Sequence, residues 1–372
     1  MNLRRARPAR ERWGPAAGPW VAALGLALAV LGAQSLAGLA PPLVERYYSR
    51  GLYPHIGRGL SFVSQVVPFS IGEWLLILLL PALAFWLARP RRVVAVLLRL
   101  VWLAGGAGLL FLVVWGLNYQ RQPLGVSLDL GRREASAEEL EAISRALVAG
   151  ANRNYGEALG RQEPAEGSRL PMARTQLYEM IEAAYQAEPL LGEVGRGRYG
   201  PPKPVYFSSL LTRLGIAGIY SPFTGEPNYN AEQPDCDLPH AIAHEKAHQR
   251  GFAREDEANF AAFLVCVNAA DPYVRYSGYQ QALRVVGLLS RAAPERAREI
   301  WGQLGPGPRA DLRARSAFWR RREGRVLGAV ARRANDAYLR ANRVESGIRS
   351  YDEVTAMIIS YYLKYPVESR AR

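Results

Sequence analysis

The sequence predicts a mainly α-helical membrane protein, in which three N-terminal transmembrane helices precede a larger domain outside the bilayer. Three runs almost free of charged residues occupy the first third of the chain, and runs of this length are typical of transmembrane helices. Beyond them, amphipathic helical patterns alternate with Gly- and Pro-rich breaks. Two short β-rich segments predict a small sheet. The predicted anchor is residues 1–118, and residues 119–372 form a predicted α+β domain with a helical C-terminal half.

The three apolar runs span about residues 20–40, 70–88 and 100–117. Each comes close to the ~20 residues that an α-helix needs to cross ~30 Å of hydrocarbon. For the first run the alternative is a cleavable signal peptide, but its apolar stretch exceeds the roughly 7 to 15 residues of a signal core, and two more spans follow. For the second and third runs the alternative is a buried helical hairpin. Their length and their shortage of charged residues argue against it.

Arginine residues predict the orientation of the spans, because positively charged segments stay in the cytoplasm. Arginines are dense before the first span and between the second and third, but diluted between the first and second. They are, in that order, Arg4, Arg5, Arg7, Arg10 and Arg12; Arg89, Arg91, Arg92 and Arg99; and Arg46, Arg50 and Arg58. We therefore expect a cytoplasmic N-terminus and an extracytoplasmic C-terminal domain, with Trp102, Trp115 and Tyr119 in the aromatic belts of the third span.

The net charge of +14 is compatible with nucleic-acid binding. However, Lys203, Lys246 and Lys364 are the only lysines, and the arginines are scattered rather than gathered in one tract. We therefore expect no nucleic-acid partner, and a solvated basic surface that meets the lipid bilayer or anionic envelope polymers.

The elements of the domain follow from caps, periodicity and breakers. Ser136 and Glu139 form a capping box that opens a helix through Leu147, and a second helix is predicted over 173–187. Strands are predicted at 205–207 and 215–220, followed by the turn-rich connection "SPFTGEPNYN" at 221–230. Helices are predicted towards the C-terminus at 279–292, 295–304, 310–322, 326–342 and 351–364.

The segment "HEKAHQ" contains His244, Glu245 and His248, and the chain has only four histidines. Asp237 as N-cap, Pro239 in the first turn and Gly251 just past the end predict one helix around them. Residues four apart lie on the same face of a helix, so both imidazoles could bind one metal ion. A catalytic zinc also needs a third protein ligand and an open position for water.

The third ligand is expected to be acidic, because Arg254 stands where the longer HExxHxxGxxH pattern has a histidine. Glu255 and Glu257 are two residues apart, about 200° around a helix, so only one can point at the metal. The alternative is that these carboxylates only complement a helix dipole. Glu255 with Ala258 and Asn259 resembles the ExxA(D/N) signature of gluzincin metallopeptidases. This resemblance implies that Glu255 binds zinc and that Asn259 supports a ligand from the second shell.

Taken whole, the chain resembles an uncharacterised bacterial family of membrane-anchored zinc peptidases with three N-terminal spans and an exported HExxH domain. The resemblance rests on "PFTGEPN" at 222–228, "AHEKAHQRGFAREDEANF" at 243–260 and "NDAYLRAN" at 335–342. It implies a zincin-like domain, one Zn²⁺ ion and a multi-pass location in the bacterial plasma membrane. It implies a reaction type but no specific substrate.

The expected function is extracytoplasmic, zinc-dependent hydrolysis of a peptide or envelope protein. His244, His248 and Glu255 would hold the metal, and Glu245 would act as general base. Residues 216–230 would supply either an edge strand that pairs with an extended peptide or a plain scaffold strand. A tyrosine or arginine would stabilise the oxyanion, with Tyr220, Tyr276, Tyr338 and Tyr351 left open. The rival expectation is a non-catalytic envelope scaffold or binding protein with a structural or degenerate metal site.

The two cysteines are expected to lie close together. If the helix of His244 and the next helix pack antiparallel about a turn near Phe252, Cys236 and Cys266 come to face each other. A disulfide is one alternative, since an exported domain permits oxidation. Two buried free thiols are the other.

Overall fold

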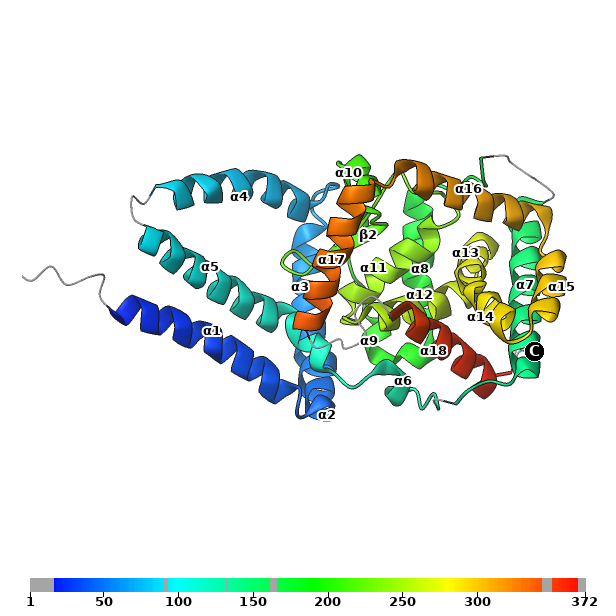
Figure 1. Ribbon diagram of the computed structural model, residues 1–372, viewed down its shortest axis with the longest axis horizontal. Coiled ribbons are helices and arrows are strands. Elements are labelled where there is room, and N and C mark those ends of the chain that lie inside the picture. Colours follow the sequence, from blue (N-terminus) through cyan, green and yellow to red (C-terminus); the bar gives the residue numbers. More distant parts are fainter. Residues whose placement is uncertain (1–16, 90–92, 132, 161–165, 343–349, 367–372) are drawn as a thin grey trace, which may run out of the picture.

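Three apolar helices extend from one end of a helical domain (Figure 1). The computed structural model describes residues 17–89, 93–131, 133–160, 166–342 and 350–366. Helices α1 (Ala17–Ala37), α4 (Ile71–Ala88) and α5 (Val93–Val114) are each long and apolar enough to cross a membrane. This confirms the three predicted apolar helices, although α5 begins before residue 100. Arg99 lies inside α5, where its guanidinium stacks 4.4 Å from the Trp86 ring centroid.

The far ends of these helices carry part of the positive charge that predicts their orientation. Arg89 follows α4 and Arg99 lies early in α5, and Figure 1 shows these ends of the two helices directed away from the domain. The N-terminal arginines at 4–12, and Arg91 and Arg92, lie outside the described residues. Both the crossing of a membrane and its direction therefore stay predictions.

The described segment between α1 and α4 is helical, although it contains no apolar run long enough to cross a membrane. It comprises α2 (Pro41–Leu43), the π-helical η1 (Val44–Leu52) and α3 (Tyr53–Ser64). The reason is tertiary: the buried Glu45 carboxylate pairs with Arg121 at 2.7 and 2.9 Å, and Tyr53 is fully buried. Although it precedes the second span, this segment packs as part of the domain.

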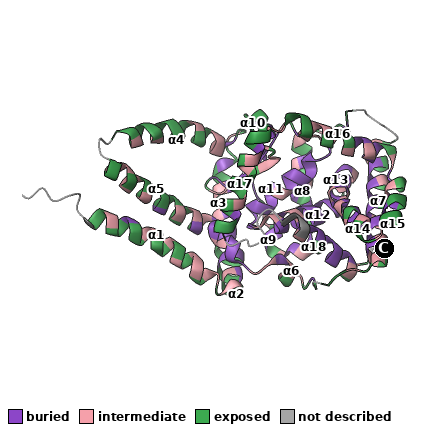
Figure 2. Ribbon diagram, in the orientation of Figure 1, coloured by how far each residue is buried: buried purple, intermediate pink, exposed green. Residues whose placement is uncertain are grey.

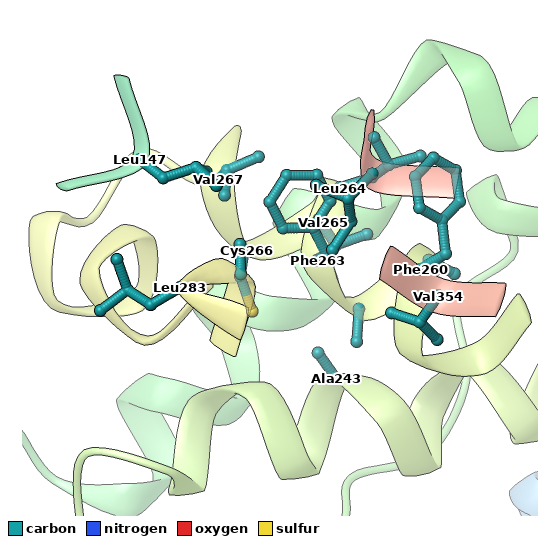
Figure 3. Close-up of a cluster of buried hydrophobic side chains, with 14 of the residues drawn as sticks. Leu147, Ala243, Phe260, Phe263, Leu264, Val265, Cys266, Val267, Leu283 and Val354 are labelled. Carbon is teal, nitrogen blue, oxygen red and sulfur yellow. The ribbon is translucent and has the colours of Figure 1, made fainter. Parts of the chain in front are cut away.

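The domain core is built around the helix α12 (Glu255–Val267), which is buried along almost its whole length. Helices α8 (Arg174–Ala187), α11 (Leu238–Gln249), α13 (Pro272–Ala282) and α18 (Ser350–Lys364) pack against it. Figure 3 shows Phe260 and Phe263 of α12 within this core, with Val354 of α18 beside them. Figure 2 shows the contrast with the apolar helices, whose surfaces are largely exposed and so available to lipid.

The remaining elements complete the layers around this core. Their bounds are η2 (Gly116–Gln120), α6 (Leu124–Ser127), α7 (Ala137–Leu159), η3 (Pro189–Leu191), α9 (Gly192–Arg196), α10 (Ser208–Leu214), α14 (Arg284–Ala292), α15 (Pro294–Gln303), α16 (Pro306–Arg322) and α17 (Arg325–Ala341). The capping box of Ser136 and Glu139 is present at the start of α7. The helix predicted at 279–292 is instead divided between α13 and α14 at Leu283.

A mixed three-stranded sheet lies beside α11. Its order is β1 (Lys203–Pro204), β3 (Glu226–Tyr229), β2 (Gly218–Ser221), with β1 parallel and β2 antiparallel to β3. The strand predicted at 205–207 is wrong: the backbone N–H groups of Tyr206 and Phe207 donate to the Glu73 carboxylate at 2.8 Å and lead into α10. The predicted connection at 221–230 contains the central strand. The edge strand β2 is the second predicted strand, shifted towards the C-terminus.

Glu226, from the segment "PFTGEPN", joins the sheet to the start of α4. Its carboxylate accepts hydrogen bonds from the backbone N–H groups of Ile71 and Gly72 at 2.9 and 2.8 Å. It also forms an ion pair with Lys203 at 2.6 Å, and the side chains of both residues are almost fully buried. A carboxylate at a helix N-terminus satisfies unpaired N–H donors and complements the helix dipole. This pair therefore fixes the second apolar helix to the domain.

We expect Glu226→Ala to lower the free energy of unfolding by about 3–5 kcal/mol, because removing one partner leaves the Lys203 charge buried and unpaired. Glu295→Ala is the matched control, since its pair with Arg298 is largely exposed and should be worth no more than about 1 kcal/mol. Unfolding of the purified full-length protein in detergent measures both changes. Equal losses in the two variants would contradict this account of the Glu226 contact.

Cys236 and Cys266 are buried free thiols, so the disulfide alternative is wrong. Both residues pack against α13. The Ser277 hydroxyl donates to the Cys236 carbonyl at 2.7 Å, and Gly278 lies so close to Cys266 that an added Cβ would be 2.7 Å from the cysteine Cβ. A third helix thus contacts both cysteine segments of the hairpin.

Candidate metal centre

The end of α11 is a turn that requires glycine. Gly251 has φ +88°, and its N–H and that of Phe252 donate to the carbonyls of His248 and Ala247, the pattern of a Schellman motif. A Cβ at Gly251 would also lie 2.9 Å from the Tyr53 ring. The predicted end of the helix is confirmed. Asp237 is the N-cap residue, as predicted, but its side chain makes no capping hydrogen bond, because the carboxylate pairs with Arg315 at 3.1 Å.

His244, His248 and Glu255 come together as the sequence predicts. The two histidine Nε2 atoms are 3.1 Å apart, and Glu255 oxygens lie 3.3 Å from His244 Nε2 and 3.6 Å from His248 Nε2. Ligand atoms ~2.0–2.1 Å from a tetrahedral zinc ion are ~3.3–3.4 Å from one another. The three side chains therefore fit the spacing of one divalent metal ion.

The hydrogen bonds around the histidines orient one of them for metal binding. His248 Nδ1 lies 2.7 Å from the carbonyl oxygen of Phe252, so a neutral His248 donates from Nδ1 and presents the Nε2 lone pair to the site. Burial lowers the pKa of His248, but Glu255, Glu245 and the Phe252 carbonyl together raise it, to about 9. The site thus favours a bound positive charge.

The Asn259 side chain is hydrogen-bonded to the backbone of a candidate ligand rather than to a ligand side chain. Its amide donates to the backbone carbonyl of Glu255 at 2.8 Å, one turn earlier in α12. The short Asn259 side chain reaches the backbone of its own helix. The carbonyl of Phe252 is the group that orients the His248 ring. Asn259 therefore acts on the first turn of α12, which carries Glu255.

Glu245 lies beside the three candidate ligands, and its side chain is buried. Its Oε2 is buried without a hydrogen-bond partner among the described residues. Burial raises the pKa of the Glu245 carboxyl to about 7, against the opposing effect of His244 and His248. A Cβ at Gly218 of β2 would be 2.5 Å from Glu245 Oε1, so a larger residue at that position would displace the Glu245 side chain. A buried carboxyl with such a pKa is suited to accept and return a proton.

Glu257 points elsewhere, as the helix geometry predicts. It is buried and accepts a hydrogen bond from the backbone N–H of Leu124 at 2.8 Å. It is therefore a structural acceptor rather than an exposed complement to the dipole of α12.

The centre opens into a cavity of about 740 Å³ that is also lined by β2, α16 and α17. Trp115 and Tyr119 line it as well, and both are buried, so their assignment to an aromatic belt is wrong. The indole N–H of Trp115 donates to the His248 carbonyl at 3.1 Å. The position of Trp115 and Tyr119 after an apolar run is compatible with a membrane belt and with a place in the domain. Only their tertiary contacts distinguish the two locations.

The four tyrosines left open by the sequence separate in the structure. Tyr220 and Tyr338 line the cavity. Tyr276 is buried and donates to Asp311 at 2.7 Å, and the side chain of Tyr351 lies outside the described residues. Tyr119, which the sequence assigns to an aromatic belt and not to the site, donates to the Tyr338 hydroxyl at 3.2 Å.

Comparison with known proteins identifies one family. Residues 48–359 match the family described as "Protein of unknown function (DUF3810)". No curated protein and no solved structure showed significant similarity to the chain. The match covers the later part of η1, the apolar helices α4 and α5, and all three residues of the candidate metal centre.

Proposed function

Since the chain belongs to the DUF3810 family of proteins of unknown function, we propose a function from the geometry of its own site: a membrane-anchored zinc metallopeptidase of gluzincin type, with a zincin-like domain. The observation that carries this proposal is the spacing of His244, His248 and Glu255 next to Glu245, whose Oε2 lacks a partner among the described residues. Two imidazoles and a carboxylate, with a carboxylate base beside them, are the parts of a zinc hydrolase.

The chain would supply each remaining part of the reaction. His244, His248 and Glu255 would hold zinc, which when bound provides a Lewis acid and lowers the pKa of water to about 7. Glu245 would take a proton from the attacking water at its unpaired oxygen and return it to the departing amine nitrogen. The water oxygen joins the carbonyl carbon as the C–N bond breaks, so hydrolysis yields one carboxylate and one amine.

The open edge of β2 supports a peptide substrate. Asn230 N–H donates to the Ala217 carbonyl at 2.8 Å, and hydrogen-bonded pairs alternate along antiparallel strands. Gly218 and Tyr220 therefore direct their backbone N–H and C=O groups away from β3. An extended peptide can add to such an edge as a further strand, and Gly218 would hold it beside Glu245.

Tyr338 is the proposed donor to the oxyanion. The Tyr53 hydroxyl donates its single proton to the Gln249 carbonyl at 2.9 Å. In the hydrogen bond between the Tyr53 and Tyr220 hydroxyls, 3.2 Å apart, Tyr220 is therefore the donor, and its proton is not free for a substrate. Tyr338 accepts from Tyr119 and keeps its own proton for the cavity. Tyr338 is also 39% exposed, which leaves it accessible to a substrate.

We expect Tyr338→Phe to lower kcat by about 10²–10³-fold, the usual effect of losing one oxyanion donor. Zinc content and KM should change little, because the aromatic ring and its packing remain. Tyr220→Phe is the matched control and should leave most of the activity. Steady-state kinetics of both variants decide the assignment, and a larger loss in Tyr220→Phe would reverse it.

The proposed location is the bacterial plasma membrane, with the metal centre outside the cytoplasm. Support comes from the arginine distribution and from the three apolar helices that leave one end of the domain. We expect reporter fusions after Arg92 and Arg372 to report cytoplasm and exterior respectively. The opposite pattern would refute the orientation.

The test of the proposed function is peptide cleavage by the purified full-length protein. A broad peptide library should be cleaved, a chelator should stop cleavage, and added zinc should restore it. Bound metal with no cleavage of any peptide would favour the rival proposal, a non-catalytic envelope scaffold that keeps a structural metal site.

A further inference from the structure

The candidate metal centre lies next to the end of an apolar helix. Helix α5 ends at Val114, and the next residue, Trp115, donates its indole N–H to the carbonyl of His248 at 3.1 Å. The Tyr48 hydroxyl donates to the carbonyl of Val113 at 2.8 Å, which further ties this end of α5 to the domain. One side chain therefore separates a candidate metal ligand from the point at which α5 would leave a bilayer.

The edge strand β2 connects this surface to the proposed base. At its C-terminal end, Ser221 packs against Gly72 at the start of α4, and the Phe223 ring in the following turn lies 6.5 Å from that of Phe111 in α5. At the other end, Gly218 packs on Glu245. With a rise of ~3.3 Å per residue, the strand from Gly218 to Ser221 spans about 10 Å.

Helix α17 also lines the cavity and contacts the first apolar helix. Arg332, Asn335 and Tyr338 line the cavity, while the Ala341 carbonyl accepts a hydrogen bond from Gln34 of α1 at 3.4 Å. Figure 1 shows α17 across the end of the domain from which the apolar helices leave. Its exposed residues include the aliphatic Val326, Leu327 and Val330. Such a helix, which also carries arginines, is typical of one that lies on a bilayer surface.

We infer that the substrate is a membrane-anchored polypeptide, cleaved within a few residues of its own transmembrane segment. This inference rests on the proposed function. A polypeptide paired along β2 would pass Gly218 beside Glu245 and reach the level of the α4 and α5 ends about three residues later. Its apolar segment would then continue into the bilayer next to these helices. A soluble peptide pairs with the same strand but gains nothing from the membrane.

Three matched peptide libraries test this inference on the full-length protein in phosphatidylethanolamine–phosphatidylglycerol vesicles. The same randomised segment is placed about three residues from a synthetic Leu/Ala transmembrane helix, placed about 30 residues away on a Gly/Ser linker, or left free. Because effective concentration falls roughly as the −3/2 power of linker length, we expect cleavage of the near library to be about 30-fold faster than that of the distant one. Mass spectrometry locates the cuts, and Glu245→Gln gives the background.

The outcomes separate the inference from the proposed function. Fastest cleavage of the near library, with cuts close to the helix, supports both. Equal rates for the three libraries, or fastest cleavage of the free one, overturn the membrane-anchored substrate and leave the peptidase intact. Glu245-dependent release of lipid fragments instead of peptides would overturn the polypeptide class. Cleavage of no library above the Glu245→Gln background would overturn the proposed peptidase together with the inference.

Discussion

Glu255→Ala is expected to abolish tight zinc binding. Glu255 supplies the only carboxylate oxygens among the three described candidate ligands, at 3.3 and 3.6 Å from the two histidine Nε2 atoms. Loss of a direct ligand should weaken binding by more than the ~10–100-fold that loss of a supporting residue costs. Zinc titration against a competing chelator, on the purified full-length protein, measures the change.

Glu257→Gln is the matched control for Glu255→Ala, because it removes a charge from the same turn of α12 and keeps an acceptor for Leu124 N–H. It should retain zinc. From the sequence alone, Glu257 would stabilise the protein only through the dipole of α12. Because Glu257 is buried, Glu257→Ala should instead cost about 1–3 kcal/mol of stability by leaving the Leu124 N–H unpaired. Zinc binding that survives in Glu255→Ala and is lost in Glu257→Gln would show that the ligand is misassigned.

Glu245→Gln is expected to lower peptide turnover by about 10²–10⁴-fold, the usual contribution of a general base. Glutamine has nearly the same shape, so it fits against Gly218, but it cannot accept the proton from water. Zinc content should be unchanged, because Glu245 is outside the candidate ligand group. Turnover and zinc content measured on the same preparation separate lost chemistry from lost metal. Unaltered turnover would rule out Glu245 as the base.

The parts of the fold that follow from local pattern could be predicted from the sequence. The three apolar helices, the capping box of α7 and the helix pair α11–α12 each depend on the spacing of residues within one segment. The approach of His244, His248 and Glu255 follows from that helix pair, because the Gly251 turn fixes how α12 returns past α11.

The parts that depend on distant contacts could not be predicted. Strand β3 is written "EPNY" and has the composition of a turn, but the buried pair of Glu226 with Lys203 holds it in the centre of the sheet. Trp115 follows an apolar run and fits a membrane belt by position, whereas its contact with His248 buries it. The amide of Asn259 could have reached several partners, and its own helix backbone provides the nearest one.

Zinc K-edge X-ray absorption of the purified full-length protein tests the metal centre most directly. The account predicts one zinc per chain, with two imidazole nitrogens and carboxylate or water oxygens at about 2.0–2.2 Å. In Glu245→Gln this spectrum should persist, and in Glu255→Ala the bound zinc should disappear. Sulfur ligands at about 2.3 Å, a different resident metal, or a chain that binds no zinc would contradict the central claim.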